Sequence, residues 1–256
     1  MKSVRAPRSL VHRLVPRRVN DWVRQAVEHV TYPADFSPED VELCESVSDH
    51  TMTSPERVLA LRDAVRHVVA RRIPGDFVEC GVWRGGSMMV VARTLLGLGE
   101  RRELHLFDTF EGMSAPTAED VALDARRAKD LLEASARKPG RGVWCIAGEE
   151  DVRANVEGTG YPRALVRLVR GKVEDTLPAA APGRIALLRL DTDWYESTRH
   201  ELEHLYPRLS PGGVLLIDDY GYWKGARKAV DEYFASLGEP LLLHRIDITG
   251  RLVIKP

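Results

Sequence analysis

The chain has 256 residues, a formal net charge of −1 and a hydrophobic fraction of 44%. This length suits one large α/β domain with an appendage, and the near-neutral charge gives no electrostatic basis for nucleic acid as the principal partner. No apolar run reaches the roughly 18 residues that a membrane span needs. Cys44, Cys80 and Cys145 are widely spaced and form no disulfide framework or zinc motif, and arginines interrupt every apolar stretch of the first twenty residues, so we expect a cytoplasmic protein.

Residues 1–75 are predicted to form an N-terminal helical extension that caps the main domain. The first twenty residues are basic, and the simplest interpretation is a loosely docked terminus, with contact to a partner subunit as the alternative. An amphipathic helix is predicted between Ser54-Pro55-Glu56, a typical helix start, and Ile73-Pro74-Gly75, a typical stop. We expect this helix to cover part of a cleft in the main domain, and we expect a homodimer.

Residues 76–256 alternate short apolar runs with helical segments, the pattern of βαβ units. Helices are predicted at 87–98, 149–156 and 224–237, and parallel strands at 76–81, 103–108, 165–169, 185–190 and 214–217. Because Thr249-Gly250 is too short for a crossover, the strand at 251–255 must return antiparallel to that at 241–248. We therefore predict an α/β fold with a Rossmann-like sheet of five parallel strands and a C-terminal antiparallel hairpin, the plan typical of class I S-adenosylmethionine methyltransferases.

Residues 111–142 form the longest stretch without a clear strand, and they are rich in Ala, Asp and Arg. Segments of this length inside a compact domain are often lids over a site. A surface helix with solvated charges is the alternative, and the sequence leaves both open.

A glycine-rich turn joins the first predicted strand to its helix. Glycines allow a close backbone approach to a ligand, and the helix start offers free N–H groups to an anionic end. Asp108 ends the second strand, where a carboxylate can accept hydrogen bonds from ribose hydroxyls, and Glu79 could meet an ammonium group. A ligand with an anionic end, an ammonium group and a ribose is more naturally S-adenosylmethionine than NAD. The turn contributes Glu79, Gly81, Gly85, Gly86 and Ser87.

Acidic residues close two other predicted strands, Asp191 in IALLRLD and Asp218-Asp219 in VLLIDDY. A single charge at a strand end is usually a solvated terminus or a helix cap. The carboxyl ends of parallel strands share one edge, however, and three carboxylates gathered there would repel one another without a cation. Mg²⁺ is the default candidate because it prefers oxygen ligands. Asp193 is better interpreted as a cap for the helix that follows.

The chain from about Pro74 onwards resembles the macrocin/mycinamicin-type O-methyltransferase family, whose members methylate sugar hydroxyls of macrolides and related natural products. The similarity rests on a combination of motifs: ECGVWRGGS, LFDTFEGM, VRANVEGTGYP, GKVEDTLP, LLRLDTDWYEST, LYPRLSPGGVLLIDDYG and WKGARKAVDEYF. Residues before about 50 match the family poorly.

This resemblance implies roles for particular residues. Those at Glu79, Gly81 and Ser87 would border the methionine end of S-adenosylmethionine, and Asp108 would hold the ribose. Glu174 and Asp175 would lie near the adenine. Mg²⁺ would be bound by Asp191, Asp218 and Asp219, with Asp191 also as the general base. The set of cofactor-binding residues then comprises Glu79, Gly81, Gly85, Gly86, Ser87, Asp108, Phe110, Glu174, Asp175 and Asp191.

The reaction predicted from these features is transfer of the sulfonium methyl group to a hydroxyl of a small molecule, such as a sugar of a natural product. Three alternatives belong to other classes. Asp191-Thr192-Asp193 imitates the D-x-D of metal-dependent phosphatases, and Tyr220 with Lys224 spells the Y-x-x-x-K of NAD-dependent dehydrogenases. A non-catalytic S-adenosylmethionine-binding protein is the third. The sequence does not name the acceptor.

Overall fold

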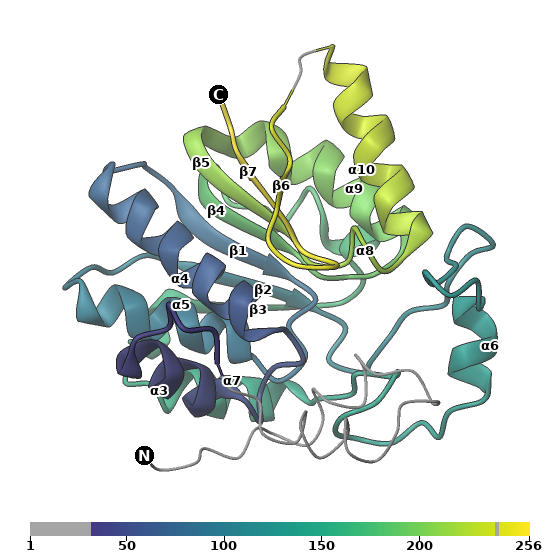
Figure 1. Ribbon diagram of the computed structural model, residues 1–256, viewed down its shortest axis with the longest axis horizontal. Helices are drawn as coiled ribbons and strands as arrows, with labels where there is room; N and C mark the ends of the chain where they lie inside the picture. The colour runs from purple at the N-terminus through teal and green to yellow at the C-terminus, as the bar shows by residue number, and fades with distance from the viewer. Residues whose placement is uncertain (1–31, 239–240) are drawn as a thin grey trace.

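A computed structural model describes residues 32–238 and 241–256 (Figure 1). The prediction made for the basic first twenty residues lies outside these ranges. Seven strands form one sheet in the order β3-β2-β1-β4-β5-β7-β6. β1 to β5 are parallel, β7 is antiparallel to β5, and β6 is antiparallel to β7. The predicted fold class is therefore confirmed.

The strands end close to where the apolar runs end, and all have the bounds that follow: β1 Asp76–Cys80, β2 Leu104–Asp108, β3 Val166–Arg170, β4 Ile185–Leu190, β5 Leu209–Ile217, β6 His244–Arg245 and β7 Arg251–Ile254. The α-helices are α3 Pro38–Val47, α4 Pro55–Ala70, α5 Gly86–Gly97, α6 Ala128–Glu133, α7 Glu149–Glu157, α8 Val173–Thr176, α9 Tyr195–Leu205 and α10 Lys224–Leu237. Two short 3₁₀ helices span Arg163–Leu165 and Tyr206–Arg208.

The strand predicted at 241–248 is much shorter than expected. Only His244 and Arg245 pair with β7, opposite Leu252 and Arg251. The chain then turns, with Asp247 accepting hydrogen bonds from the backbone N–H groups of Thr249 and Gly250. β6 is the edge strand of the sheet, so β7 is its only neighbour. Because the chain turns at Asp247, few residues of the apolar run can pair with β7.

Helices cover both faces of the sheet (Figure 1). Apolar side chains of α3, α4, α5 and α7 form one core with alternate strand residues such as Phe77 and Leu187. Those of α8, α9 and α10 form a second core with the intervening residues, such as Val78 and Leu188. This alternation follows from the two-residue period of a strand. The alternation breaks near the start of β4, where the register shifts between Ile185 and Leu187 and these two residues belong to different cores.

The two described N-terminal helices have good start signals. Ser37 and Asp40 form a capping box at α3, and the Ser54 side chain caps α4 before Pro55. α4 therefore begins where the sequence predicted, and it packs on α5, β4 and β5. The boundary between an extension and a main domain at residue 75 stays a prediction.

Segment 111–142 is neither a long helix nor an extended loop. Its only helix is α6, six residues long, which Figure 1 shows away from the sheet. Asp120 is fully buried and accepts hydrogen bonds from the backbone N–H groups of Thr117 and Tyr195. Ala122 forms a bridge with Trp223, whose ring packs edge-on against Trp194. The segment is thus anchored on loops that follow β4 and β5, while its function as a lid stays a prediction.

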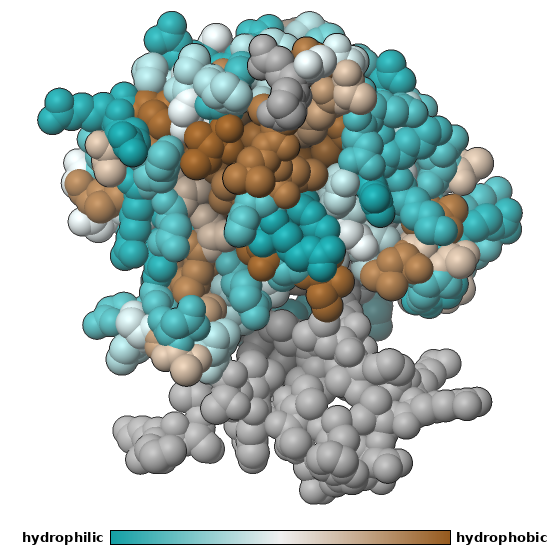
Figure 2. Space-filling model, turned by 45° about the horizontal axis from the view of Figure 1, so that its top comes forward, coloured by the Kyte–Doolittle hydropathy of each residue, from teal (hydrophilic) through white to brown (hydrophobic). Residues whose placement is uncertain are grey.

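Among the described residues, no helix is long and apolar enough to cross a membrane. Figure 2 shows apolar surface gathered in the upper middle of one face, with hydrophilic side chains around it.

Candidate active site

The turn from β1 into α5 is glycine-rich because it packs against other backbone. Gly81 has a φ of 82°, and a Cβ there would overlap the carbonyl oxygen of Asp191. Gly86 donates its N–H to the carbonyl of His50 at 3.0 Å, and a Cβ there would overlap that carbonyl. Gly81 and Gly86, which were predicted to allow a close approach of a ligand, therefore also allow the backbone segments after β4 and α3 to pack closely against the turn. Gly85, with a φ of 83°, precedes α5, whose start has no side-chain cap.

Asp108 fastens the ends of β1 and β2 together. One of its oxygens accepts from the N–H groups of Val82 and Trp83 at 2.7 and 3.0 Å, and the other accepts from the Phe110 N–H at 2.8 Å. Burial raises the pKa of Asp108, although these backbone bonds oppose the rise. The predicted contact with a ribose is untested. The structure adds that Asp108 shapes the glycine-rich turn itself.

Glu79 is a buried carboxylate with one unpartnered oxygen. It is 1% exposed, and its Oε1 accepts from Arg189 at 2.6 Å. Its Oε2 has no hydrogen-bond partner among the described residues. Burial raises the pKa of Glu79 to about 7, with Arg189 opposing the rise. An unpaired buried carboxylate oxygen is costly, so this atom is suited to a cationic or hydrogen-bonding ligand.

Carboxylates gather at the ends of β4 and β5. Asp191, Asp193 and Asp219 each offer an oxygen, and these oxygens lie within 4.8 Å of one another. Burial raises the pKa of Asp191 well above its usual value, and Asp218 and Asp219 add to the rise. Burial and then Asp193 raise that of Asp219 in the same way. Two of the three predicted metal ligands, Asp191 and Asp219, are therefore brought together.

Asp218, the third predicted metal ligand, is bonded to arginines, and it shares one of them, Arg189, with Asp191. Its Oδ1 accepts from Arg189 at 2.5 Å, and its Oδ2 pairs with Arg57 of α4. Burial opposes its ionisation, but Arg189 and Arg57 outweigh burial and hold the pKa of Asp218 below its usual value. Asp218 is thus already paired with two guanidinium groups.

Asp193 does not cap a helix, so that interpretation is wrong. The N-cap of α9 is Trp194, whose own side chain makes no capping hydrogen bond, and Asp120 rather than Asp193 accepts from the N–H of Tyr195, the first residue of the helix. Asp193 lies in the left-handed region with a φ of 69°, and its carboxylate accepts from the indole N–H of Trp223 at 2.8 Å. Aspartate tolerates this backbone conformation better than most residues. The left-handed residue turns the side chain towards Asp191 and Asp219.

Comparisons with known proteins identify the family of the chain. The family model for macrocin O-methyltransferase (TylF) matches residues 13–254, so the match begins well before residue 50 and the expectation of a poor match there is wrong. The chain belongs to this O-methyltransferase family. It is 42% identical to the 8-demethyl-8-(2,3-dimethoxy-α-L-rhamnosyl)-tetracenomycin-C 4'-O-methyltransferase of Streptomyces olivaceus, over 78% of this chain and 74% of that protein.

Two more relatives extend the comparison. The mycinamicin III 3''-O-methyltransferase of Micromonospora griseorubida is 33% identical, with 86% of each chain covered. The solved structure of the O-methyltransferase NovP is 33% identical and superimposes with a TM-score of 0.70, covering 80% of this chain and 82% of that one. Membership of the macrocin O-methyltransferase family, which the motifs predicted, is therefore confirmed.

The dehydrogenase and phosphatase interpretations find no support in the geometry of this family member. Tyr220 lies before α10, and its hydroxyl bonds to Asp231 at 2.7 Å, while Lys224 is the first residue of that helix. The pair therefore does not lie one turn apart on a helix. The D-x-D sequence follows β4, and its second carboxylate is held by Trp223.

The two acidic residues expected near an adenine lie at the same edge of the sheet. Glu174 and Asp175 belong to α8, the short helix after β3. Glu174 is half-buried and Asp175 is exposed. Glu174 also contributes to the raised pKa of Glu201, though burial is the main cause. The adenine contact itself stays a prediction.

Sequence reasoning missed two charged residues of this site, Arg189 and Arg57. Arg189 is the only charge in the IALLRL run, which was a signal that the buried strand needs carboxylate partners on the same face. Arg57 lies on an amphipathic helix, and nothing in the local pattern distinguishes it from a solvated arginine. It pairs with Asp218 and, at 3.0 Å, with Asp247.

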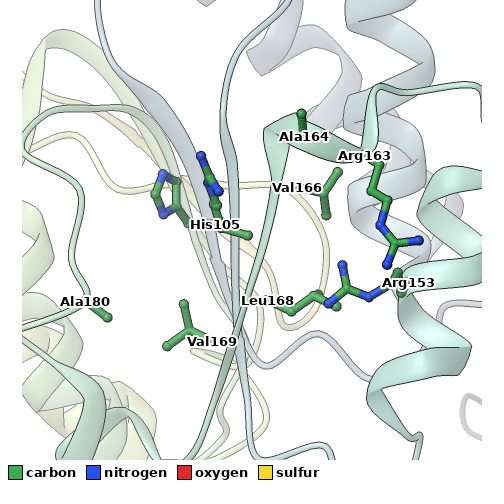
Figure 3. A pocket seen from close by; sticks show the side chains of 9 residues that line it. His105, Arg153, Arg163, Ala164, Val166, Leu168, Val169 and Ala180 are labelled. Carbon is green, nitrogen blue, oxygen red and sulfur yellow. The ribbon is translucent and has the colours of Figure 1, made fainter.

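A hollow along β3 is separate from this site (Figure 3). It is lined by His105, Arg153 and Arg163, together with residues of the edge strand β3. None of the predicted cofactor or metal residues lines this hollow.

Proposed function

We propose that the protein transfers the methyl group of S-adenosylmethionine to a sugar hydroxyl of a small natural product. The observation that carries the proposal is the convergence of Glu79, with its unpartnered oxygen, and the Asp191, Asp193 and Asp219 group at one sheet edge. The names of the relatives, which include a tetracenomycin-C 4'-O-methyltransferase and a mycinamicin III 3''-O-methyltransferase, support a glycosylated acceptor.

The residues present suit S-adenosylmethionine. Glu79 Oε2 is buried and unpartnered, so the ammonium group of the methionine end would satisfy it. The start of α5 carries no side-chain cap, and although the N–H of Gly86 is bonded to His50, the N–H groups that follow it in the first turn suit the carboxylate of the same end. Asp108, which ends β2, is the remaining candidate for the ribose. We assign Gly81, Gly85, Ser87, Phe110, Glu174 and Asp175 to the rest of the cofactor site, as the family resemblance implies.

The donor set also suits a divalent cation. Asp191 and Asp219 would hold Mg²⁺, with either Asp193 or Asp218 beside them, and the arginines on Asp218 favour Asp193. The chemistry that the cation supplies when bound is Lewis-acid polarisation of a hydroxyl oxygen. Titration of Mn²⁺ into Asp193→Asn and Asp218→Asn separates the two: the true ligand should lose about tenfold or more in Mn²⁺ affinity, and the other should change less.

The protein's own residues position the reactants and accept a proton. Orientation of a hydroxyl in line with the sulfonium methyl can contribute roughly 7 to 11 kcal/mol to lowering the barrier. Asp191 is the candidate general base, although a carboxylate that also holds the cation is a weak base, so its role as a ligand carries more of the proposal. A base of this kind contributes typically about 10² to 10⁴-fold. Trp194 and Trp223 sit beside the acidic group, where segment 111–142 can limit the access of water.

The test is an assay with labelled S-adenosylmethionine, Mg²⁺ and a panel of deoxysugar glycosides, followed by mass spectrometry. The proposal expects one acceptor to gain a methyl group at a sugar hydroxyl, and no turnover with NAD. Binding of S-adenosylhomocysteine without product from any hydroxyl acceptor would support a non-catalytic binding protein instead. The homodimer also stays a proposal, and light scattering of the purified protein tests it.

A further inference from the structure

Arg189 lies in the interior of the sheet, where a charge is expensive. It belongs to β4, the central strand between β1 and β5, and it is 4% exposed. Its register partners are Glu79 on β1 and Leu216 on β5. Moving a guanidinium group out of water costs several kcal/mol unless its partners compensate. The identity of those partners therefore indicates what the residue is for.

Three carboxylates share this one guanidinium group. Nη1 donates to Glu79 Oε1 at 2.6 Å and to Asp191 Oδ2 at 2.8 Å, and Nη2 donates to Asp218 Oδ1 at 2.5 Å. The carboxylates come from β1, the end of β4 and the end of β5. A planar fork can hold several oxygens in fixed directions, whereas the single ammonium of a lysine cannot.

All four residues lie on the same face of the sheet. Phe77, Leu187 and Leu216 belong to the core under α3, α4 and α5, and strand alternation places Glu79, Arg189 and Asp218 on that face too. Arg57 of α4 holds Asp218 from the other side. Asp218 thus pairs with two guanidinium groups, whereas Arg189 is the only ion-pair partner of Glu79 within the described part of the chain.

Arg189 leaves ligand-facing atoms open. Glu79 Oε2 stays unpartnered, and the Asp191 side chain remains 27% exposed although its Oδ2 is bonded. A buried ion-pair network is a weak source of stability, because apolar residues of similar volume often stabilise as well. Arg189 does, however, fix the directions of Glu79 and Asp191, which the proposed function assigns to different ligands, the cofactor and the acceptor.

On the basis of the proposed function, we propose that Arg189 is a positioning residue that ties the cofactor end of the site, at Glu79, to its acceptor end, at Asp191. Its Nη1 is the atom that the two carboxylates share. Glu79 is then correctly placed for the ammonium group only while Arg189 holds it, and Asp191 is oriented by the same nitrogen.

A double-mutant cycle with S-adenosylhomocysteine as the probe tests this by calorimetry at pH 8. Glu79→Gln alone should weaken binding about tenfold. In the Arg189→Lys background the same change should matter less than about twofold, because Glu79 is no longer held. Arg167→Lys is the matched control: it is another strand arginine with a carboxylate partner, Glu103, and should leave the Glu79→Gln effect at its full size. Equal effects in all backgrounds would overturn the proposal.

A second cycle leaves Arg189 unchanged, in case its substitution prevents folding. Glu79→Gln and Asp191→Asn remove the two acceptors of Nη1, and their effects on S-adenosylhomocysteine affinity should be non-additive by at least about threefold. Additive effects would contradict the shared role of Nη1. Failure of the wild-type protein to bind S-adenosylhomocysteine would instead remove the proposed function, and this inference with it.

Discussion

Two groups of acidic side chains lie at opposite ends of the strands, and they differ in their surroundings. At the carboxyl ends, Asp191, Asp193 and Asp219 offer oxygens within 4.8 Å of one another. At the amino ends, Asp76 and Glu103 flank His105, and these three offer donor atoms within the same distance. The nitrogen Nε2 of His105 is 3.4 Å from Asp76 and 3.5 Å from Glu103.

The contrast shows that proximity of ligand-type residues does not define a site. The other carboxylate oxygen of Glu103 forms an ion pair with Arg167. Burial lowers the pKa of His105, and the charge of Asp76 opposes this decrease. The carboxyl-end group instead lies beside the Gly81 turn and the buried Arg189. We therefore place the chemistry at the carboxyl end alone.

The largest expected effect follows from Asp191→Asn. The substitution removes a candidate base and a candidate cation ligand together, so we expect methyl transfer to fall by about 10³-fold, within the range for base catalysis. Initial rates with a saturating acceptor measure it. A rate within tenfold of wild type would mean that another carboxylate of the group performs both roles.

Asp108→Ala should weaken cofactor binding by about 1 to 3 kcal/mol, the scale for lost hydrogen bonds to a charged group. Part of the loss is expected from the turn, because Asp108 also holds the N–H groups of Val82 and Trp83. Calorimetry with S-adenosylhomocysteine gives the value. Unchanged affinity would show that neither the turn nor a ribose depends on Asp108.

Segment 111–142 sharpens the comparison, because its anchoring contacts, to Tyr195 and Trp223, lie in the loops that follow β4 and β5, beside the carboxyl-end group. Asp120→Ala removes acceptors for the N–H groups of Thr117 and Tyr195, so the anchor should weaken by about 1 to 3 kcal/mol. Hydrogen exchange should then be faster throughout the segment. In the wild-type protein, cofactor and acceptor together should slow exchange there, as expected of a lid. Protection that ligands leave unchanged would favour the simple surface interpretation.

Glu79 predicts a pH dependence of stability that the substitution Glu79→Gln should remove. Burial raises its pKa to about 7 in the folded protein, so the folded state holds a proton that the unfolded state has released. The stability contributed by protonated Glu79 is full below the unfolded pKa and is lost as pH rises towards 7. The free energy of unfolding of wild type should therefore fall relative to that of Glu79→Gln between about pH 5 and 7. Denaturant titrations at several pH values that keep the difference constant would contradict the raised pKa.

The smallest effect is expected at the amino ends. Glu103→Gln removes one partner of Arg167, whose side chain is 56% exposed. Partly exposed ion pairs contribute at most about 1 kcal/mol, so the midpoint of unfolding should change little and cofactor affinity should not change. A tenfold change in cofactor affinity would show that the two ends of the sheet are coupled.

The five parallel strands, the antiparallel C-terminal end and the strand-end carboxylates were predictable from the sequence, because apolar runs and their acidic ends mark buried parallel strands. The directions in which the strand-end carboxylates point were only partly predictable. Asp218 and Asp219 both follow the end of β5 at Ile217, so the strand pattern alone does not tell which partners each carboxylate meets. In the folded protein, Asp218 pairs with Arg189 and Arg57, whereas Asp219 lies beside Asp191 and Asp193. The left-handed backbone of Asp193 and the ion pair from Arg57 of α4 depend on tertiary contacts, which no local pattern records.

The most direct test is a crystal structure with S-adenosylhomocysteine and Mn²⁺, using the anomalous signal of the metal. We predict the nucleoside and methionine over the β1 and β2 ends, with the ammonium group at Glu79 Oε2. The manganese peak should lie among the carboxylates of Asp191 and Asp219. A peak at Asp76, Glu103 and His105 instead, or a cofactor bound away from Glu79, would contradict the placement of the active site at the carboxyl ends of the strands.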